Sequence, residues 1–508
     1  MNIYDYKQNN KNYVRHKVLS HAVEALTVDR QQACCVSRKY VRKVVDYFLQ
    51  FDEDEPSRKE VEEIRPDFYS SWESLHDSVI GYKRPSDLSV CYLSGPQPEN
   101  DFNELISLGV LPQNIWAFEN DKETYLKAVD SYNTIDFPQP KIIKMSIEQF
   151  FKHSPKKFDI VYIDACGAVV SSQHALRSVA TLFYYQRLNS PGVLVTNFSK
   201  PDVTKQSIRD NFTEVIALYM VFKEYPNANI AESNENLIID HYENIYKRVQ
   251  VMFDDYYGDF ITCILSDLAS IIIPLQRFGE IAGYSNLFTK EEMEYSMSPN
   301  DLKSINNIKN NSIGKWILTM DYIKKKCYGN FNFSLSIYDL IGIDGNWEKL
   351  IKGIKYFTAL KNGYFGDNSK VALMGNFFDS KQNLYQFLDL PSASLFYDVV
   401  INQLTYPLHS NSDKCQSYKY CAKSTDMFTD LIVYDECRYL YEWLPAIHQI
   451  ENAMKNKSWQ YIFRFALDGL VKQRINYNNE FFFQGSVISK DEKEFKAKVR
   501  KKREKIGG

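Results

Sequence analysis

The chain is poor in the residues that small secreted scaffolds depend on. Glycine occurs 20 times in 508 residues and cysteine nine times, an odd number that includes no C-x-x-C pair. A disulfide framework is therefore excluded, and reduced intracellular thiols are the simplest interpretation. Lys and Arg number 61 against 64 Asp and Glu, a net charge of −3. This balance argues against a nucleic-acid coat protein and against an acidic disordered chain.

Long hydrophobic runs are also missing. Residues 1–17 are polar and rich in Asn, without the apolar core or cleavage site of a signal peptide. The longest apolar stretch, residues 260–275, is interrupted by Ser266 and Asp267 and falls short of the roughly 20 apolar residues that a membrane span needs. We therefore expect a buried helix there, no membrane partner, and a soluble protein of the cytoplasm.

Aromatic residues are abundant. Tyr 36, Phe 32 and Trp 6 make up 15% of the chain, and hydrophobic residues make up 44%. So many rings with so few glycines indicate packed helices and stacking surfaces over a sizeable core. The excess lies mainly beyond residue 205, which makes that half the place where recognition of a large molecule is expected.

Changes in composition divide the chain into four segments. Residues 1–85 have helical spacing, residues 86–204 alternate between strand and helix patterns, and residues 205–489 are mainly helical and aromatic-rich. Residues 490–508 form a basic tail with nine Lys or Arg and four Asp or Glu. A solvated helix or frayed end is the first interpretation of this tail, and a contact to nucleic acid through residues 500–503 is the alternative.

Five apolar runs predict the fold class. Residues 88–93, 114–118, 142–147, 158–163 and 192–197 are each followed by a turn or helical pattern with short connections. This alternation is typical of an α/β, doubly wound, mostly parallel sheet. Further strands are expected at residues 370–374 and 431–434 within the otherwise helical C-terminal region.

Chemically distinctive residues follow these predicted strands. The first run ends at Ser94-Gly95-Pro96, the second at Glu119, the third at Met145-Ser146 and the fourth at Asp164. In open α/β sheets, ligands bind beyond the carboxyl ends of the strands, and an acid roughly 20 residues after a glycine turn suits the hydroxyls of a ribose. The sequence therefore predicts a nucleotide site at this edge.

This series resembles the class I S-adenosylmethionine-dependent methyltransferases, over roughly residues 88–200. The resemblance implies a Rossmann-like domain that binds S-adenosylmethionine, with Asp164 also in a catalytic position. The cofactor-binding positions that it implies are Ser94, Gly95, Pro96, Glu119, Asn120, Met145, Ser146 and Asp164. Two features depart from the family. The first loop has a single glycine flanked by prolines, and Asp164-Ala-Cys-Gly167 replaces the Asp/Asn-Pro-Pro-aromatic motif of amino-directed methylation.

Several residues have more than one interpretation. Glu119 is a ribose ligand or a solvated acid, and Asp164 is a site residue or a cap for the next helix. Cys166 is favoured as a structural thiol over a nucleophile. The only Cys/His cluster in the sequence, His409 with Cys415, Cys421 and Cys437, misses the short spacing of zinc sites, so no metal is expected.

Three functions remain open at this stage. The first is a methyltransferase-like enzyme acting on a large substrate, with nucleic acid as the first candidate because aromatic rings stack on unpaired bases. The second is an inactive methyltransferase-like scaffold or interaction subunit. The third is an NAD enzyme, which the missing G-x-G-x-x-G motif argues against. The sequence leaves the methyl acceptor and the oligomeric state open.

Overall fold

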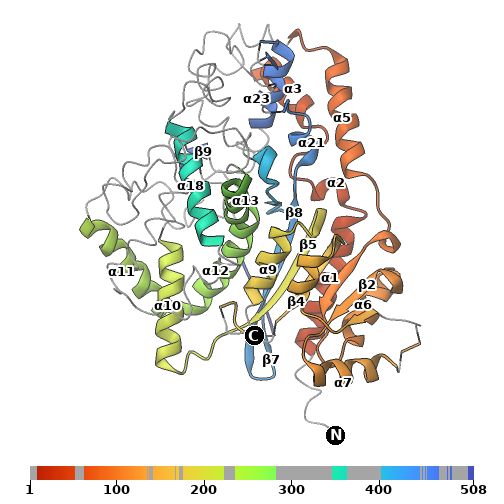
Figure 1. Cartoon of the computed structure of the whole chain (residues 1–508), viewed down its shortest axis with the longest axis vertical. Helices are drawn as coiled ribbons and strands as arrows, with labels where there is room; N and C mark the ends of the chain where they lie inside the picture. The colour runs from red at the N-terminus through yellow and green to blue at the C-terminus, as the bar shows by residue number, and fades with distance from the viewer. Residues whose placement is uncertain are drawn as a thin grey trace.

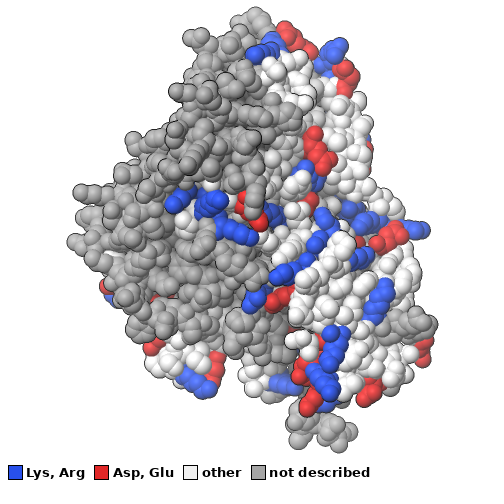
Figure 2. Space-filling model, in the orientation of Figure 1, with Lys and Arg blue, Asp and Glu red and all other residues white. Residues whose placement is uncertain are grey.

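A mixed sheet with helices on both faces forms the centre of the chain, as a computed structural model shows (Figure 1). The structure describes residues 9–51, 62–133, 135–136, 141–165, 167–170, 175–221, 235–281, 346–362, 402–446, 449, 452–453, 455–467, 477–478, 481–482 and 502–507. Lys and Arg side chains are interspersed with Asp and Glu over the described part of the face in Figure 2, in keeping with the near-balanced charge.

The central sheet contains nine of the described strands. They are Val90–Leu93 (β1), Ile115–Phe118 (β2), Lys141–Ile143 (β3), Phe158–Asp164 (β4), Leu188–Ser199 (β5), His409–Ser410 (β6), Gln416–Ala422 (β7), Thr425–Asp435 (β8) and Glu504–Ile506 (β11). Their order is β11-β7-β8-β5-β4-β1-β2-β3, and β6 pairs with β8. Tyr477–Asn478 (β9) and Phe481–Phe482 (β10) form a separate antiparallel pair.

Helices connect the strands and extend the fold on both sides. They are Asn9–Leu26 (α1), Arg30–Ala33 (α2), Tyr40–Phe51 (α3), Pro66–Ile80 (α5), Glu99–Ser107 (α6), Lys122–Tyr132 (α7), Ile147–His153 (α8), Ala175–Tyr184 (α9), Gln206–Met220 (α10), Glu235–Val251 (α11), Phe253–Asp267 (α12), Ile273–Ile281 (α13), Asn346–Asn362 (α18), Arg438–Tyr441 (α21) and Lys457–Leu467 (α23). In Figure 1, α10 to α13 and α18 lie on one side of the sheet, and α1, α6 and α7 lie on the other.

The direction of the strands confirms the predicted doubly wound parallel sheet. The strands β1 to β5 pair in parallel, whereas β8 runs antiparallel to both β5 and β7. The chain leads outward from β1 to β2 and β3, then crosses back to β4 and β5 on the other side of β1. The strand order therefore switches between β1 and β4, which is where such sheets bind ligands.

Side chains of the strands alternate between two cores. On β4, Ile160 and Tyr162 belong to the core that contains buried residues of α1, α6 and α7, whereas Val161 and Ile163 belong to the core that contains those of α8, α9 and α12. This is the period of two expected for a strand. Because both faces are covered, the run appears in the sequence as continuously apolar.

The helix over the longest apolar stretch is buried, as predicted. The segment Phe253–Ile281, which joins α12 and α13 through the π-helical turn Leu268–Ile272, is long and apolar enough to cross a membrane. However, 94% of its most apolar window is buried inside the protein. Its apolar composition is therefore explained by packing against the neighbouring helices and β8.

Two expected features differ in the structure. The third strand ends at Ile143 instead of Ile147, because Ser146 caps the start of α8 and turns the chain away. The C-terminal region expected to be mainly helical supplies β7 and β8, so the sheet extends past the expected boundary at residue 204. Residues 431–434 do lie within β8 as expected, and residues 370–374 fall outside the described residues.

The end of the basic tail also differs from its first interpretation. Residues 504–506 form a strand that pairs with β7, and Arg503 lies inside the fold against Asp430. A buried carboxylate holds this part of the tail, which explains why it is neither a solvated helix nor a frayed end. The preceding residues 490–501 fall outside the described residues.

Candidate functional site

The loops after β1, β2 and β3 meet at one edge of the sheet. The amide of Ser94 donates to the carbonyl of Phe118 at 3.0 Å, and the amide of Glu119 donates to the carbonyl of Ile143 at 3.1 Å. On the other side of β1, Asp164 pairs with Asn197 in the β4–β5 register. The structure thus brings all four predicted positions to the carboxyl edge.

The turn after β1 depends on Gly95. This residue has a left-handed φ of +57°, and a Cβ built there would meet no atom within 4 Å. Glycine adopts this conformation without strain, and the lack of neighbours leaves room for a ligand beside the backbone. Ser94 is buried, and its hydroxyl donates to the carbonyl of Gly95 at 3.1 Å. Pro96 follows and contributes no N–H donor.

Glu119 is half-buried and is held by its own loop. Its Oε1 accepts a hydrogen bond from the amide of Asp121 at 2.8 Å, and Asp121 caps α7 by accepting from the amide of Thr124 at 2.8 Å. The described part of the chain offers no hydrogen bond to the Oε2 atom of Glu119. That oxygen is therefore available to a ligand hydroxyl, and Asn120 beside it is exposed.

Met145 and Ser146 lie next to this loop. The amide of Met145 donates to the carbonyl of Ile143 at 2.9 Å, the same oxygen that accepts from the amide of Glu119. The hydroxyl of Ser146 accepts from the amide of Gln149 at 3.2 Å. Met145 is thus the residue of this pair that can line the site, while Ser146 has a clear role as a helix cap.

Asp164 is engaged at both carboxylate oxygens. Its Oδ1 accepts from the side-chain amide of Asn197 at 2.7 Å, and its Oδ2 forms an ion pair with Nζ of Lys11 at 2.7 Å. Asn197 is itself oriented by Thr429, which donates to its Oδ1 at 2.8 Å, and its amide also donates to the hydroxyl of Tyr420 at 3.1 Å. Side chains thus contact both oxygens of Asp164, and the alternative that it caps the next helix stays open because residues 171–174 fall outside the described residues.

A second acid and its partner lie beside Asp164. Asp101, in the first turn of α6, is buried and accepts from Nε of Arg15 at 2.6 Å. Burial raises the pKa of Asp101 to about 6, the negative charge of Asp164 adds to this, and Arg15 and Lys11 oppose it. Burial acts to lower the pKa of Arg15, yet the attraction of its acidic neighbours, Asp101 foremost, leaves it raised.

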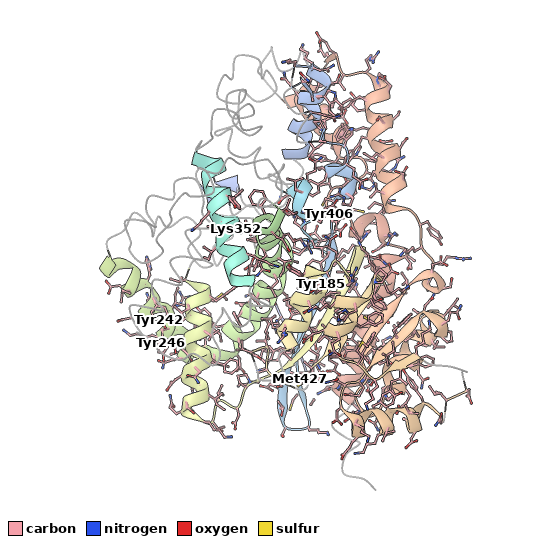
Figure 3. The ribbon with its side chains drawn as sticks, in the orientation of Figure 1. Tyr185, Tyr242, Tyr246, Lys352, Tyr406 and Met427 are labelled. Carbon is pink, nitrogen blue, oxygen red and sulfur yellow. The ribbon has the colours of Figure 1, made fainter. Side chains whose placement is uncertain are left out.

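Both cations come from α1, far away in the sequence. This helix buries Val14, Val18, Ala22 and other residues at helical spacing against the sheet, which brings its first turns over the carboxyl edge. Figure 3 labels Met427, which pairs with Ser199 at the end of β5 and marks the same end of the sheet. Sequence analysis missed Lys11, Arg15, Asp101 and Asn197, because only tertiary packing brings them together.

The residues of the predicted Cys/His cluster are separated by their contacts. Nε2 of His409 bonds to the hydroxyl of Tyr441 at 2.8 Å, Sγ of Cys415 donates to the carbonyl of Asn411 at 3.1 Å, and Cys421 is exposed. Each therefore has a local environment of its own. The candidate nucleophile Cys166 falls outside the described residues.

Cys437 instead lies in a different buried group. Its Sγ, that of Cys35 and a carboxylate oxygen of Asp435 are all within 4.8 Å of one another. Asp435 accepts hydrogen bonds from the backbone amides of Cys35 and Cys437, from the hydroxyls of Ser190 and Tyr439 and from the thiol of Cys437. Its lone pairs are therefore used within the protein, and the group is best described as a polar junction between the N-terminal segment and β8.

Comparisons with known solved structures cover 32% of this chain. No family model and no curated protein matches the chain. An S-adenosylmethionine-dependent methyltransferase from Clostridium acetobutylicum ATCC 824 is similar over 32% of this chain and 58% of its own length, with 13% identity and a TM-score of 0.19. This chain thus spans little more than half of that enzyme.

A second solved structure is similar to the same share of this chain. The magnesium protoporphyrin IX methyltransferase ChlM from Synechocystis PCC 6803, solved with bound SAM, is similar over 32% of this chain and 76% of its own length. Its identity is 14% and the TM-score is 0.19. At these TM-scores the likenesses support no conclusion about this chain. The strand order and register described above, independently of them, establish a doubly wound, Rossmann-like α/β fold.

Proposed function

We propose that the carboxyl edge of the sheet binds S-adenosylmethionine and that the protein is a methyltransferase-like enzyme. The observation that carries this proposal is that two residues suited to this ligand follow neighbouring, parallel strands. Gly95 follows β1, with a left-handed backbone and open space beside it, and Glu119 follows β2. Strand β1 borders the switch point and β2 is the next strand outward, so a nucleoside and its substituent can extend from the switch point across β1 and β2.

Each residue of the edge has a role suited to this ligand. The backbone at Ser94 and Gly95 borders the amino-acid portion, Oε2 of Glu119 accepts from the ribose hydroxyls, and Asn120 and Met145 flank the adenine. When bound, S-adenosylmethionine would supply an electrophilic methyl group. The chain itself has to align the acceptor and exclude water, since alignment accounts for much of the rate enhancement of such a transfer.

Asp164 is the proposed catalytic residue. Its carboxylate can accept a proton from an acceptor hydroxyl at Oδ2, the oxygen that Lys11 contacts in the structure. Its other oxygen remains fixed by Asn197, which keeps the group oriented. Methylation of a hydroxyl or an amine releases one proton in either case, so the preference for an oxygen acceptor rests on the sequence Asp164-Ala-Cys-Gly167, which lacks the Asp/Asn-Pro-Pro-aromatic motif of amino-directed methylation.

The start of α6 favours S-adenosylmethionine over NAD. A pyrophosphate binds at a helix N-terminus through free amides and the positive end of the helix dipole. Here Glu99 and Asp101 occupy the first turn of α6 directly after the glycine loop. Two carboxylates at that point disfavour a dianionic pyrophosphate and suit a ligand that carries a sulfonium and an ammonium group.

Binding of radiolabelled S-adenosylmethionine tests the proposal. Glu119→Gln should weaken binding by roughly tenfold or more, because one charged hydrogen bond to the ribose contributes about 1.5–3 kcal/mol. Glu123→Gln, on the first turn of the next helix, is the matched control and should bind like the natural protein. Undetectable binding of the natural protein at millimolar cofactor would refute the proposal.

We propose a large molecule as the acceptor, with nucleic acid as the first candidate. The support is the aromatic content of the sequence beyond residue 205. Tyr242 and Tyr246 on α11, with their rings 6.1 Å apart (Figure 3), add none, because Tyr242 is buried and Tyr246 packs against the same core. Arg503 gives no support, since it lies inside the fold. Filter binding of single-stranded RNA and DNA oligonucleotides at two salt concentrations tests this, and the absence of binding at low salt would exclude it.

Two observations favour a second candidate function, an inactive scaffold. The Lys11–Asp164 ion pair and the single glycine of the first loop both reduce what the edge can offer a cofactor. A scaffold should elute from cell extract in a complex of fixed stoichiometry, measured by size exclusion with light scattering. It should also show no S-adenosylmethionine binding, which separates it from the enzyme.

A further inference from the structure

Arg503 fills a polar socket that is built from residues far away in the sequence. Its guanidinium group donates to both carboxylate oxygens of Asp430, at 3.0 and 2.9 Å. It also donates to two carbonyls of the sheet, those of Tyr418 at 3.0 Å and Thr429 at 3.1 Å. On α12 it donates to the carbonyl of Gly258 at 2.9 Å and to the hydroxyl of Thr262 at 3.0 Å. It also lies over the ring of Phe428, 5.4 Å from its centroid. Nη2 contacts both oxygens of Asp430 while Nη1 donates to the carbonyls of Tyr418 and Thr429, so the two ends of the guanidinium group reach acceptors that a single lysine ammonium group would not span.

The socket needs the positive charge. Asp430 is fully buried, while the Arg503 side chain is 15% exposed. The other hydrogen bonds to Asp430 in the described part of the chain come from the neutral hydroxyls of Thr262 and Ser417, each at 2.6 Å. A buried carboxylate without a counter-charge is strongly unfavourable. The residues on the sheet therefore form a binding site for an arginine, and the chain supplies one from its last residues.

The residues after Arg503 extend this contact along the sheet edge. Glu504, Lys505 and Ile506 pair in parallel with Tyr418, Lys419 and Tyr420 of β7. Gly507 follows with a φ of +71°, and a Cβ there would lie 2.5 Å from Nδ2 of Asn10. The segment thus reaches α1 at a position where the left-handed backbone favours glycine and where a Cβ would require the Asn10 side chain to move.

The same segment holds α1 from the side. Oε1 of Glu504 forms an ion pair with Nζ of Lys17 at 3.3 Å, and Ile506 packs against the core that contains Val14 and Val18. The helix therefore lies between the terminal segment and the carboxyl edge, where Lys11 contacts Asp164. In Figure 1 the marked end of the chain lies beside β7.

We propose that residues 503–507 are a latch that docks reversibly on β7 and holds α1 over the carboxyl edge of the sheet. The occupant of the β7 edge is this segment of the same chain. Arg503 anchors it in the socket, the short strand aligns it, and Glu504 with Gly507 transmits its position to α1. The latch does not depend on which ligand the edge binds.

Hydrogen exchange of the full chain tests the latch without any cofactor. In Arg503→Ala, amides of residues 416–422 and of residues 14–26 should exchange at least tenfold faster than in the natural protein, because the strand pairing and the clamp on α1 are both lost. Lys505→Ala, which changes an exposed side chain of the same segment, should leave both unchanged. Residues 66–80 of α5 are the internal reference for the general loss of stability that Arg503→Ala also causes, and their exchange should rise less than that of β7 and α1.

A second variant separates the contact of Glu504 with α1 from the contact of Arg503 with Asp430. Glu504→Ala should increase exchange in α1 and leave β7 close to the natural protein, because the socket is intact. If Arg503→Ala fails to fold, Arg503→Lys keeps the charge while losing the fork, and it should show the same pattern to a smaller degree.

Three outcomes would overturn the proposal. The first is unchanged exchange of α1 in either variant, which would mean that the segment does not hold the helix. The second is a uniform increase that includes α5, which would reveal a general loss of stability. The third is a natural dimer that Arg503→Ala converts to a monomer in light scattering, which would place the segment on a neighbouring copy.

Discussion

Lys11 on α1 and Asp164 at the end of β4 form an ion pair with 2.7 Å between Nζ and Oδ2. The Lys11 side chain is 32% exposed and that of Asp164 is 14% exposed, so the pair lies at the boundary between the protein and solvent. It connects the N-terminal helix directly to the carboxylate for which the methyltransferase resemblance implies a catalytic position. The effect of Lys11 on ligand affinity therefore decides what the carboxyl edge of the sheet can bind.

Removal of the lysine charge should strengthen binding of a cationic ligand. In Lys11→Met, Asp164 loses its cation and the edge becomes more negative, so we expect S-adenosylmethionine to bind about threefold to tenfold more tightly at low salt. Equilibrium dialysis at 50 and 300 mM salt would measure this effect and its screening. Lys39→Met, at an exposed position at the start of α3, should leave the affinity unchanged, and a loss of affinity in Lys11→Met would contradict the assignment.

A methyl group at Gly95 should block the ligand. Gly95→Ala places a side chain in the open space beside the turn and strains a left-handed residue by about 1 kcal/mol. We expect S-adenosylmethionine binding to weaken more than tenfold while the protein remains folded. Gly81→Ala is the matched control, since Gly81 has a φ of +62° with equally open surroundings but ends α5. Equal binding by the two variants in calorimetry would rule out a ligand at the turn.

The buried anchor of the tail should be important for stability. Arg503→Ala leaves Asp430 buried without its counter-charge, and breaking one partner of such a pair costs about 3–5 kcal/mol. Urea denaturation should therefore show a lower free energy of unfolding for Arg503→Ala. The double variant Asp430→Asn with Arg503→Met should recover part of this loss, because it removes the unpaired charge. A change below about 1 kcal/mol would mean that the tail contributes little.

Asp101 should make stability depend on pH in an unusual direction. Burial, with Asp164 adding to it, raises its pKa to about 6 in the folded protein, whereas an unfolded Asp has a pKa of about 3.9. Between these values the folded state binds more protons, so stability falls as pH rises, by at most about 3 kcal/mol in total. Asp101→Asn should remove this dependence between pH 4 and 6.

Urea midpoints measured across that range would test the effect. Asp121→Asn is a useful contrast, because the Thr124 amide lowers the pKa of Asp121 and its contribution is lost as pH falls instead. If Asp101→Asn keeps the same slope as the natural protein, the buried Arg15–Asp101 pair is not the source of the pH dependence.

Local sequence was sufficient to predict the parts of the site that follow directly from strands. The turn at Gly95 and the acids at Glu119 and Asp164 come immediately after apolar runs, and the parallel pairing of β1, β2 and β4 places them at one edge. The third strand was overestimated because Ile147 continues the apolar pattern, although Ser146 already begins a helix.

The remainder of the site depends on contacts between distant segments. Lys11 and Arg15 are ordinary polar positions in a helical pattern, and nothing local indicates that α1 lies over the sheet. Arg503 belongs to a run of charges that is usually solvated, and only the buried Asp430 on β8 explains its position. Strand β7 was missed because its side chains are partly exposed at the sheet edge, so the run lacks the continuous apolar pattern of β4.

A crystal structure determined with S-adenosylmethionine present tests the central claim most directly. The account predicts the ribose hydroxyls on Oε2 of Glu119, the methionine portion beside Gly95, and the sulfonium on the side of Asp164. Crystals grown at millimolar cofactor that show none at this edge, or that show it bound elsewhere on the chain, would contradict the account.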